Sequence, residues 1–169
     1  MQELKIPKDR IAVLVGTKGL TKRKLEKKTK TKILINSEDG DIIIEGDSLE
    51  CYTSLKIIKA IGRGFNPEIA VNLIKEDMDL GIINIEDYSR DTENDVRRIK
   101  ARLIGKNGKA RSLLESLTNT NISVYGKTVS IIGDIENLET ATQAVINLIN
   151  GSKHGNVYAF IQKRRKISR

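Results

Sequence analysis

Two short glycine motifs hold the residues of this sequence best suited to binding a ligand. Gly16-Thr17-Lys18-Gly19 and Gly105-Lys106-Asn107-Gly108 each follow an apolar pair and precede a helical pattern. Glycine allows the tight backbone turn that brings N–H groups close to an oxygen atom, and the start of a helix favours negative charge. A lysine inside each turn adds a positive charge. The spacing therefore predicts two phosphate-binding loops.

An internal repeat surrounds both motifs. Adding 89 to a residue number in the first half gives the matching residue type in the second half at many positions. The matched pairs include Leu14 with Leu103, Leu25 with Leu114, Glu26 with Glu115, Thr29 with Thr118 and Ile33 with Ile122. After the next strand pair the offset falls to 87, as expected if one hairpin loop is two residues shorter. The repeat predicts two structural units in tandem.

Length and composition fit this organisation. A chain of 169 residues accommodates two units of roughly 80 residues, each large enough to bury its own core. Hydrophobic residues make up 38% of the chain and charged residues 31%, a balance typical of globular proteins. We expect a first domain at 1–75 with a trailing helix, an acidic linker at 76–80, and a second domain at 81–169 with a C-terminal basic helix or tail.

The rarity of cysteine and histidine excludes several kinds of site. Cys51 is the only cysteine and His154 the only histidine, so we expect no disulfide framework, no His/Cys metal cluster and no cofactor. The N-terminus lacks an apolar signal region, and no stretch approaches the ~20 apolar residues of a membrane span. These features favour a cytoplasmic protein without a membrane segment.

Enzymatic chemistry is also disfavoured. The segment 105–110 lacks the leading glycine and the Ser/Thr that a P-loop places around its lysine. The abundant carboxylates are typical of linker and hairpin charge and do not form a recognisable acid/base pair. We therefore expect that the chain is not an enzyme.

The positive charge is concentrated around the two glycine motifs. The chain carries a formal net charge of +8, with eleven Lys/Arg against three acids in residues 1–32 and seven Lys/Arg without an acid in residues 97–111. Residues 36–50 hold six acids and no base, so the two signs are separated along the chain. Such basic segments are typical of a polyanion partner, although a solvated helix face is the alternative for either segment alone.

Each half of the chain predicts the same order of elements. In the first half we expect a strand at 3–6, helices at 11–15 and 20–29, strands at 31–35 and 41–45, and a helix from 47 to about 61. In the second half we expect a strand at 81–86, helices at 96–104 and 110–117, strands at 121–125 and 128–132, and a helix through 138–148. A further helical segment follows each half, at 67–74 and at 157–166.

The order strand-helix-GxxG-helix-strand-strand-helix resembles the eukaryotic-type (type I) KH domain, an RNA-binding module of α+β fold, here in tandem. More narrowly, the chain is similar to the archaeal and eukaryotic ribosome-assembly KH proteins called Dim-two or partner-of-Nob. This similarity lies in the run 99–111 and in His154-Gly155-Asn156-Val157-Tyr158 before a basic tail. Generic KH domains place an apolar residue three positions after the second glycine, whereas this chain has Lys22 and Arg111, which fits the narrower family.

The resemblance implies binding of single-stranded RNA, with each glycine loop holding backbone across ~4 nucleotides. It implies that the RNA is the 3′ region of small-subunit ribosomal RNA. It also implies two candidate protein partners, an endonuclease of rRNA maturation and the alpha subunit of translation initiation factor two. The residues expected to bind RNA are Gly16, Thr17, Lys18, Gly19, Lys22, Arg23, Arg102, Gly105, Lys106, Asn107, Gly108, Lys109 and Arg111.

Several alternatives stay open from the sequence. Strand aliphatic residues are either walls of a base-binding groove or ordinary core; they are Ile33, Ile35, Ile122 and Val124. His154 is a turn or helix-start residue or, less favoured, a base contact. The helix before the second motif is basic and its counterpart is apolar, so we expect the second repeat to bind RNA more strongly. The competing function is a scaffold that docks on ribosomal particles or on an initiation factor without reading RNA sequence.

Overall fold

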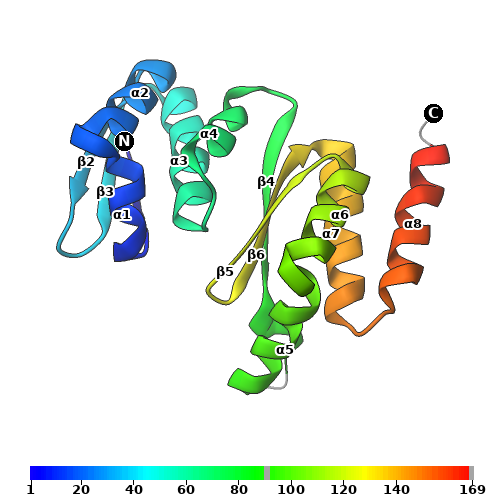
Figure 1. Ribbon diagram of the computed structural model, residues 1–169. Helices are drawn as coiled ribbons and strands as arrows, with labels where there is room; N and C mark the ends of the chain where they lie inside the picture. The colour runs from blue at the N-terminus through cyan, green and yellow to red at the C-terminus, as the bar shows by residue number, and fades with distance from the viewer. Residues whose placement is uncertain (90–91, 168–169) are drawn as a thin grey trace. The chain divides into compact units, whose positions relative to one another are not determined.

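The computed structural model describes residues 1–89 and 92–167, which form two compact units, Met1–Glu76 and Asp77–Arg169 (Figure 1). The first unit consists of β1 (Gln2–Lys5), α1 (Lys8–Val15), the 3₁₀ turn η1 (Thr17–Gly19), α2 (Leu20–Thr29), β2 (Lys32–Asn36), β3 (Asp41–Glu45), α3 (Ser48–Gly62), α4 (Pro67–Ala70) and the 3₁₀ turn η2 (Val71–Ile74). The second consists of β4 (Met78–Asn84), η3 (Ile85–Tyr88), α5 (Glu93–Ile104), η4 (Lys106–Gly108), α6 (Lys109–Thr118), β5 (Asn121–Tyr125), β6 (Thr128–Asp134), α7 (Ile135–Ile149) and α8 (His154–Ile167). The predicted repeat of element order and the α+β class are confirmed.

Each unit contains one antiparallel three-stranded sheet with the same strand order. The order is β1-β3-β2 in the first unit and β4-β6-β5 in the second. In the first unit the fully buried isoleucines of β3 are Ile42 and Ile44, two positions apart, and Ile44 pairs with the fully buried Ile33 of β2. Because side chains of a strand alternate between faces, this pattern gives the first sheet one face for its helices. In the second unit α5, α6 and α7 pack against the sheet, and α8 packs against α6 and α7 (Figure 1).

Aliphatic side chains form the core between each sheet and its helices. In the second unit the core includes Ile99, Leu103, Leu114, Ile122, Val129, Ile131, Ala141, Val145 and Leu148, and it continues to Val157 and Ile161 of α8. Buried residues of the first unit include Ile11, Leu14, Leu25, Ile33, Ile42, Ile44, Ile57, Ile58 and Ile61. The glycine loop of each unit is therefore fixed between two helices that are both anchored in a core.

Some element boundaries differ from the sequence-based expectation. The segment 76–80 was expected to be an acidic linker, but β4 begins at Met78, where backbone pairing with Asp134 of β6 outweighs local charge. The segment 67–74 divides into a short helix and a 3₁₀ turn, and α8 begins at His154, three residues earlier than expected. The expected C-terminal tail reaches residues 168–169, which lie outside the described residues.

The end of the second helix is held in the same way in both units. The Glu26 carboxylate accepts a hydrogen bond from the backbone N–H of Ile33 at 2.8 Å, and Glu115 accepts one from Ile122 at 2.7 Å. The buried Thr29 hydroxyl bonds to the Leu25 carbonyl at 2.8 Å. These contacts tie α2 and α6 to the strands that follow them, which explains several residues that recur at the offset of 89.

Within the described residues, no helix is long and apolar enough to cross a membrane. The same residues contain no group of three or more His, Cys, Asp or Glu side chains placed to hold a metal ion.

Candidate nucleic-acid interface

The two glycine loops have nearly identical backbone geometry. The first glycine of each loop lies at φ 71°, ψ 176° (Gly16) and φ 70°, ψ 177° (Gly105), a region that only glycine occupies readily. The third residue is left-handed in both loops, at φ 52° for Lys18 and φ 53° for Asn107. The loop then closes with a hydrogen bond from the N–H of the last glycine to the carbonyl of the first, at 3.2 Å between Gly108 and Gly105.

The two glycines of a loop are required for different reasons. A Cβ on Gly105 would lie 2.6 Å from the Cβ of Ala110, so this glycine lets the loop pack against the next helix. A Cβ on Gly108 would meet nothing within 4 Å, although its φ of 74° favours glycine. The first glycine of each loop therefore has a packing role, while the last borders open space.

The helices that follow the loops begin without a side-chain cap. No side chain accepts a hydrogen bond at the N-cap of α2 or α6, where the caps are Gly19 and Gly108. The first N–H groups of a helix have no partner inside the helix, and their partial positive charge attracts anions. Each loop thus presents backbone donors beside an exposed lysine, Lys18 or Lys106, an arrangement suited to phosphate.

The seven cations of residues 97–111 divide into engaged and available groups. Arg98 pairs with Asp95 at 2.6 Å, and Arg111 approaches Glu115 at 4.0 Å. Arg102 donates to backbone carbonyls inside the unit. The other four, Arg97, Lys100, Lys106 and Lys109, form no ion pair with any described residue. The second unit therefore retains four cations on α5, the loop and the start of α6 for an external anion.

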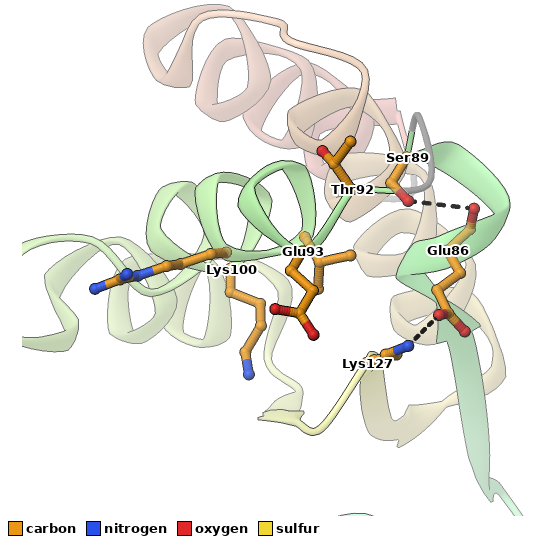
Figure 2. A pocket seen from close by; sticks show the side chains of 8 residues that line it. Glu86, Ser89, Thr92, Glu93, Lys100 and Lys127 are labelled. Atoms are coloured by element: carbon orange, nitrogen blue, oxygen red, sulfur yellow. Dashed lines mark hydrogen bonds and ion pairs between the residues drawn. The ribbon is translucent and has the colours of Figure 1, made fainter.

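A hollow of about 290 Å³ lies between the first part of α5 and the β5–β6 hairpin. Its lining includes Val96, Arg97 and Lys100 of α5, together with Lys127 of the hairpin. Figure 2 shows Glu93 and Lys100 directed into the hollow, across from an ion pair between Glu86 and Lys127. The hydrogen bond and charge of Glu86 raise the pKa of Lys127 above its usual value, so this ammonium stays charged. The hollow offers both an apolar wall and charged hydrogen-bonding groups.

The first unit repeats the ion pair that Arg111 forms with Glu115 and engages a further cation at its loop. Lys22 pairs with Glu26 at 3.4 Å, one helical turn further along α2. The Arg23 guanidinium donates to the Lys18 carbonyl at 2.7 Å, so it braces the glycine loop from the helix side. Lys18 itself forms no ion pair within the described part of the chain. Of the predicted first-loop cations, only Lys18 lies in the loop without a structural contact of its side chain.

Arg102 is engaged inside the second unit, away from the role predicted for it. Its Nε and Nη2 donate to the carbonyls of Leu148 and Ser152 at 3.3 and 2.6 Å, at the end of α7. In the first unit Arg10 makes the equivalent contacts with Ile61 and Phe65 at 2.8 and 2.7 Å. A carbonyl at a helix C-terminus attracts a cation, which explains why both units direct an arginine there. This geometry does not support phosphate binding by Arg102.

Replacing Arg102 by methionine is expected to lower the free energy of unfolding by about 2 kcal/mol, because hydrogen bonds from a charged donor to half-buried carbonyls are lost. RNA affinity should change by less than about twofold, since no phosphate contact is removed. Arg97→Met is the matched control, and it should weaken RNA binding while leaving stability within about 0.5 kcal/mol. Chemical denaturation and RNA titration of both variants measure these effects. If Arg102→Met weakened RNA binding and left stability unchanged, Arg102 would belong to the RNA-binding surface.

The structure distinguishes between the alternatives that the sequence left open. Ile33 and Ile122 are buried core residues, whereas Ile35 and Val124 are half-buried. His154 is the first residue of α8, and its Nε2 lies 2.9 Å from the Arg102 carbonyl. Because a carbonyl only accepts, Nε2 carries the proton. The helix-start interpretation of His154 is confirmed.

Comparison with known proteins decides the family. The model for the eukaryotic-type KH domain (KH-domain type I) that represents the second such domain of PNO1 matches residues 79–166, and a general KH-domain model matches residues 1–60. A KH domain-containing protein of Methanocaldococcus jannaschii is 46% identical over 98% of this chain and 75% of its own length. The chain belongs to the Dim2/PNO1 family of KH-domain proteins. Its predicted fold, two tandem type I KH domains, is confirmed.

Two further comparisons extend over nearly the whole chain. The RNA-binding protein pno1 of Dictyostelium discoideum is 26% identical over 99% of this chain and 72% of its own. Dim2p of Pyrococcus horikoshii OT3 was solved as a complex with a/eIF2alpha and rRNA; it shares 44% identity and a TM-score of 0.92, covering 98% of this chain and 94% of that one. The Dim2/PNO1 fold is therefore kept across both units.

Three cations of this Dim2/PNO1 chain were not predicted as site residues. Arg97 and Lys100 belong to the basic helix noted in the sequence, and their spacing of three places both on one face of α5. Lys127 lies in the hairpin turn, and only the fold brings it to the same hollow. The helical spacing was a usable signal for the first two residues, whereas nothing local predicts Lys127.

Proposed function

We propose that this chain binds single-stranded RNA of the small-subunit rRNA 3′ region during ribosome assembly and rRNA maturation. The observation that carries the proposal is the Gly105–Gly108 loop, where an uncapped helix start lies beside Lys106 and Lys109, which form no ion pair with a described residue. The relatives support the RNA class, because several are pre-rRNA-processing proteins and one was solved bound to rRNA. Phosphate groups bind at the loop, and unstacked bases lie along α5 toward the hollow at its first part.

The loop of the second KH domain is the principal RNA clamp in this proposal. The residues assigned to it are Gly105, Lys106, Asn107, Gly108 and Lys109, together with Arg97 and Lys100 of α5. The first loop, Gly16 to Gly19, binds RNA more weakly, because Arg23 is already engaged with the Lys18 carbonyl and Lys22 pairs more closely with Glu26 than Arg111 does with Glu115. Arg111 contributes mainly through its positive charge, because it also lies 4.0 Å from the carboxylate of Glu115. Linking both domains in one chain raises the overall affinity through effective concentration.

A protein partner accompanies the RNA in this proposal. The complex of the Pyrococcus horikoshii relative contains a/eIF2alpha as well as rRNA, which supports the initiation-factor alpha subunit as a partner of this chain. An rRNA-maturation endonuclease stays a prediction from family resemblance. The names of the relatives describe RNA-binding and pre-rRNA-processing proteins, and we propose that this chain does not itself catalyse a reaction. Purified protein should therefore neither cleave RNA nor turn over nucleotides.

Sequence-selective binding tests the proposal against the scaffold alternative. A short RNA from the 3′ region of archaeal small-subunit rRNA and a scrambled RNA of equal composition are titrated at moderate salt. We expect at least about tenfold tighter binding of the matched RNA, because base edges in the groove are read by hydrogen bonds. Equal affinities would instead favour a scaffold that docks through its basic surface.

The affinity should depend on salt in proportion to the phosphates that are neutralised. Four available cations in the second unit predict a slope of log K against log salt of about −3 for single-stranded RNA. Titrations at several salt concentrations measure this slope directly. A slope near zero would contradict phosphate binding at the loop, because neutral recognition releases no counterions.

A further inference from the structure

The first unit contains a groove beside the helix that follows its glycine loop. The groove lies between α1–α2 and α4–η2 and has a volume of about 630 Å³. On the side of α1 and α2 it is lined by Val13, Thr21, Lys24, Leu25 and Lys28. On the other side it is lined by Asn66, Pro67, Glu68 and Val71. All of these residues belong to the first unit.

In the second unit the equivalent surface is covered by α8. Adding 89 to Val13 and Lys28 gives Arg102 and Leu117. His154, the first residue of α8, contacts the Arg102 carbonyl, and Arg165 near the end of α8 donates a hydrogen bond to the Leu117 carbonyl at 3.3 Å. The helix α8 therefore runs along α6 over the surface that corresponds to the groove.

The trailing segment of the first unit is too short to cover its own surface. It consists of the four-residue helix α4 and the four-residue turn η2, which pack on α3, whereas α8 has 14 residues. Val157 and Ile161 of α8 are 1% and 0% exposed, so the surface in the second unit is a genuine helix-binding site. The first unit has the corresponding helices α1 and α2 but no long helix equivalent to α8 among its described residues.

The residues along α2 define the charge of a complementary helix. Lys24 and Lys28 occupy the positions of Leu113 and Leu117 in the second unit, and both lysines are exposed without an ion pair in the described part of the chain. Glu68 is the only acid among the groove residues, and it lies on α4. The apolar part of the groove lining includes Val13, Val71 and the nearly buried Leu25. We propose that this groove docks an amphipathic helix of a partner protein, with acidic residues beside Lys24 and Lys28.

Two other occupants fit the groove less well. The sugar-phosphate backbone of a nucleic acid would make no favourable contact with the apolar part of the groove, which favours aliphatic side chains. The α8 helix of a second copy ends in basic residues, Lys163 to Lys166, and its apolar residues are already buried in its own unit. An acidic helix satisfies both the apolar walls and the lysines.

A pair of peptides with the sequence of α8 tests the proposal. The first is the segment 154–167 carrying Lys163→Glu, Arg164→Glu, Arg165→Glu and Lys166→Glu; the second keeps the native basic residues. We expect the acidic peptide to bind the full chain at least about tenfold more tightly than the basic one, as measured by fluorescence anisotropy. Backbone amide shifts in NMR should map to α2 and α4 and leave residues 105–108 unchanged.

Charge reversal in the protein locates the binding site. Lys24→Glu with Lys28→Glu should lower the affinity for the acidic peptide at least about tenfold. The matched control Lys59→Glu with Lys75→Glu should change that affinity less than about twofold. Lys106→Asp with Asn107→Asp should leave peptide binding intact, which separates this inference from the RNA proposal. Failure of the acidic peptide to bind, equal binding of both peptides, or equal effects of the two charge reversals would each overturn the docking site. A loss of RNA affinity with Lys24→Glu and Lys28→Glu as large as that from the loop change would assign the groove to RNA instead.

Discussion

Replacing Lys106 and Asn107 together by aspartate is expected to weaken binding of the rRNA 3′ fragment by about 100-fold or more. Charge-assisted hydrogen bonds contribute about 1.5–3 kcal/mol each, and the two carboxylates also repel the phosphate. Folding should be preserved, because Asn107 lies at φ 53° and aspartate tolerates this left-handed conformation nearly as well as asparagine. Titration with labelled RNA measures the loss, and circular dichroism checks the fold.

The chain offers a control of identical chemistry for this substitution. Lys153→Asp with Asn156→Asp makes the same change of residue types and net charge at exposed positions, one just before α8 and one in its first turn. We expect it to weaken RNA binding by less than about threefold, through long-range charge alone. Thr17→Asp with Lys18→Asp in the first loop should have an intermediate effect of about tenfold. If the second-loop variant and the control bind RNA equally well, the loop is not the RNA clamp.

Replacing Gly105 by alanine is expected to destabilise the second unit by about 3 kcal/mol or more. Its backbone lies at φ 70°, ψ 177°, where a non-glycine residue costs about 1–3 kcal/mol. The added Cβ would also lie 2.6 Å from the Ala110 Cβ and 2.9 Å from the Ala110 nitrogen, so α6 must shift. Overpacking of this kind costs a further 1–3 kcal/mol or so. Chemical denaturation of the full chain, with hydrogen exchange to assign the loss to residues 77–167, measures the effect.

Gly108→Ala is the matched comparison within the same loop. Its Cβ would enter open space, and only the left-handed backbone at φ 74° opposes it, which costs about 1 kcal/mol. We expect this variant to fold nearly normally and to weaken RNA binding, because the methyl group occupies space beside the uncapped start of α6. Equal destabilisation by the two variants would contradict the separate packing and ligand-facing roles of these glycines.

The repeated pattern of the sequence predicted the fold because local and long-range signals agree at the same residues. Glu26 and Glu115 recur at one offset because each accepts a hydrogen bond from the following strand. The glycine positions were predicted for the same reason, since their backbone angles are set by the chain itself. The start of β4 at Met78 was missed, because its pairing with β6 depends on residues more than 50 positions away.

The candidate site was predicted only where a residue's role depends on its neighbours in sequence. Arg102 belongs to a basic run and was expected to bind phosphate, but the carbonyls it contacts lie 46 and 50 residues away. Lys127 joins the hollow only through the folded hairpin. Whether a cation is free or engaged depends on the tertiary structure. Charge patterning therefore predicted the basic surface but not which of its lysines and arginines are available to a ligand.

Hydrogen–deuterium exchange with and without the rRNA 3′ fragment tests the central claim most directly, because it reports each glycine loop separately in the unaltered chain. We predict that RNA slows exchange most strongly at residues 105–110, where backbone N–H groups bind phosphate, and less at residues 16–21. The α5 residues that border the hollow should also be protected. Protection confined to the first loop, or to surfaces remote from both loops, would contradict the assignment of Gly105 to Gly108 as the principal RNA clamp.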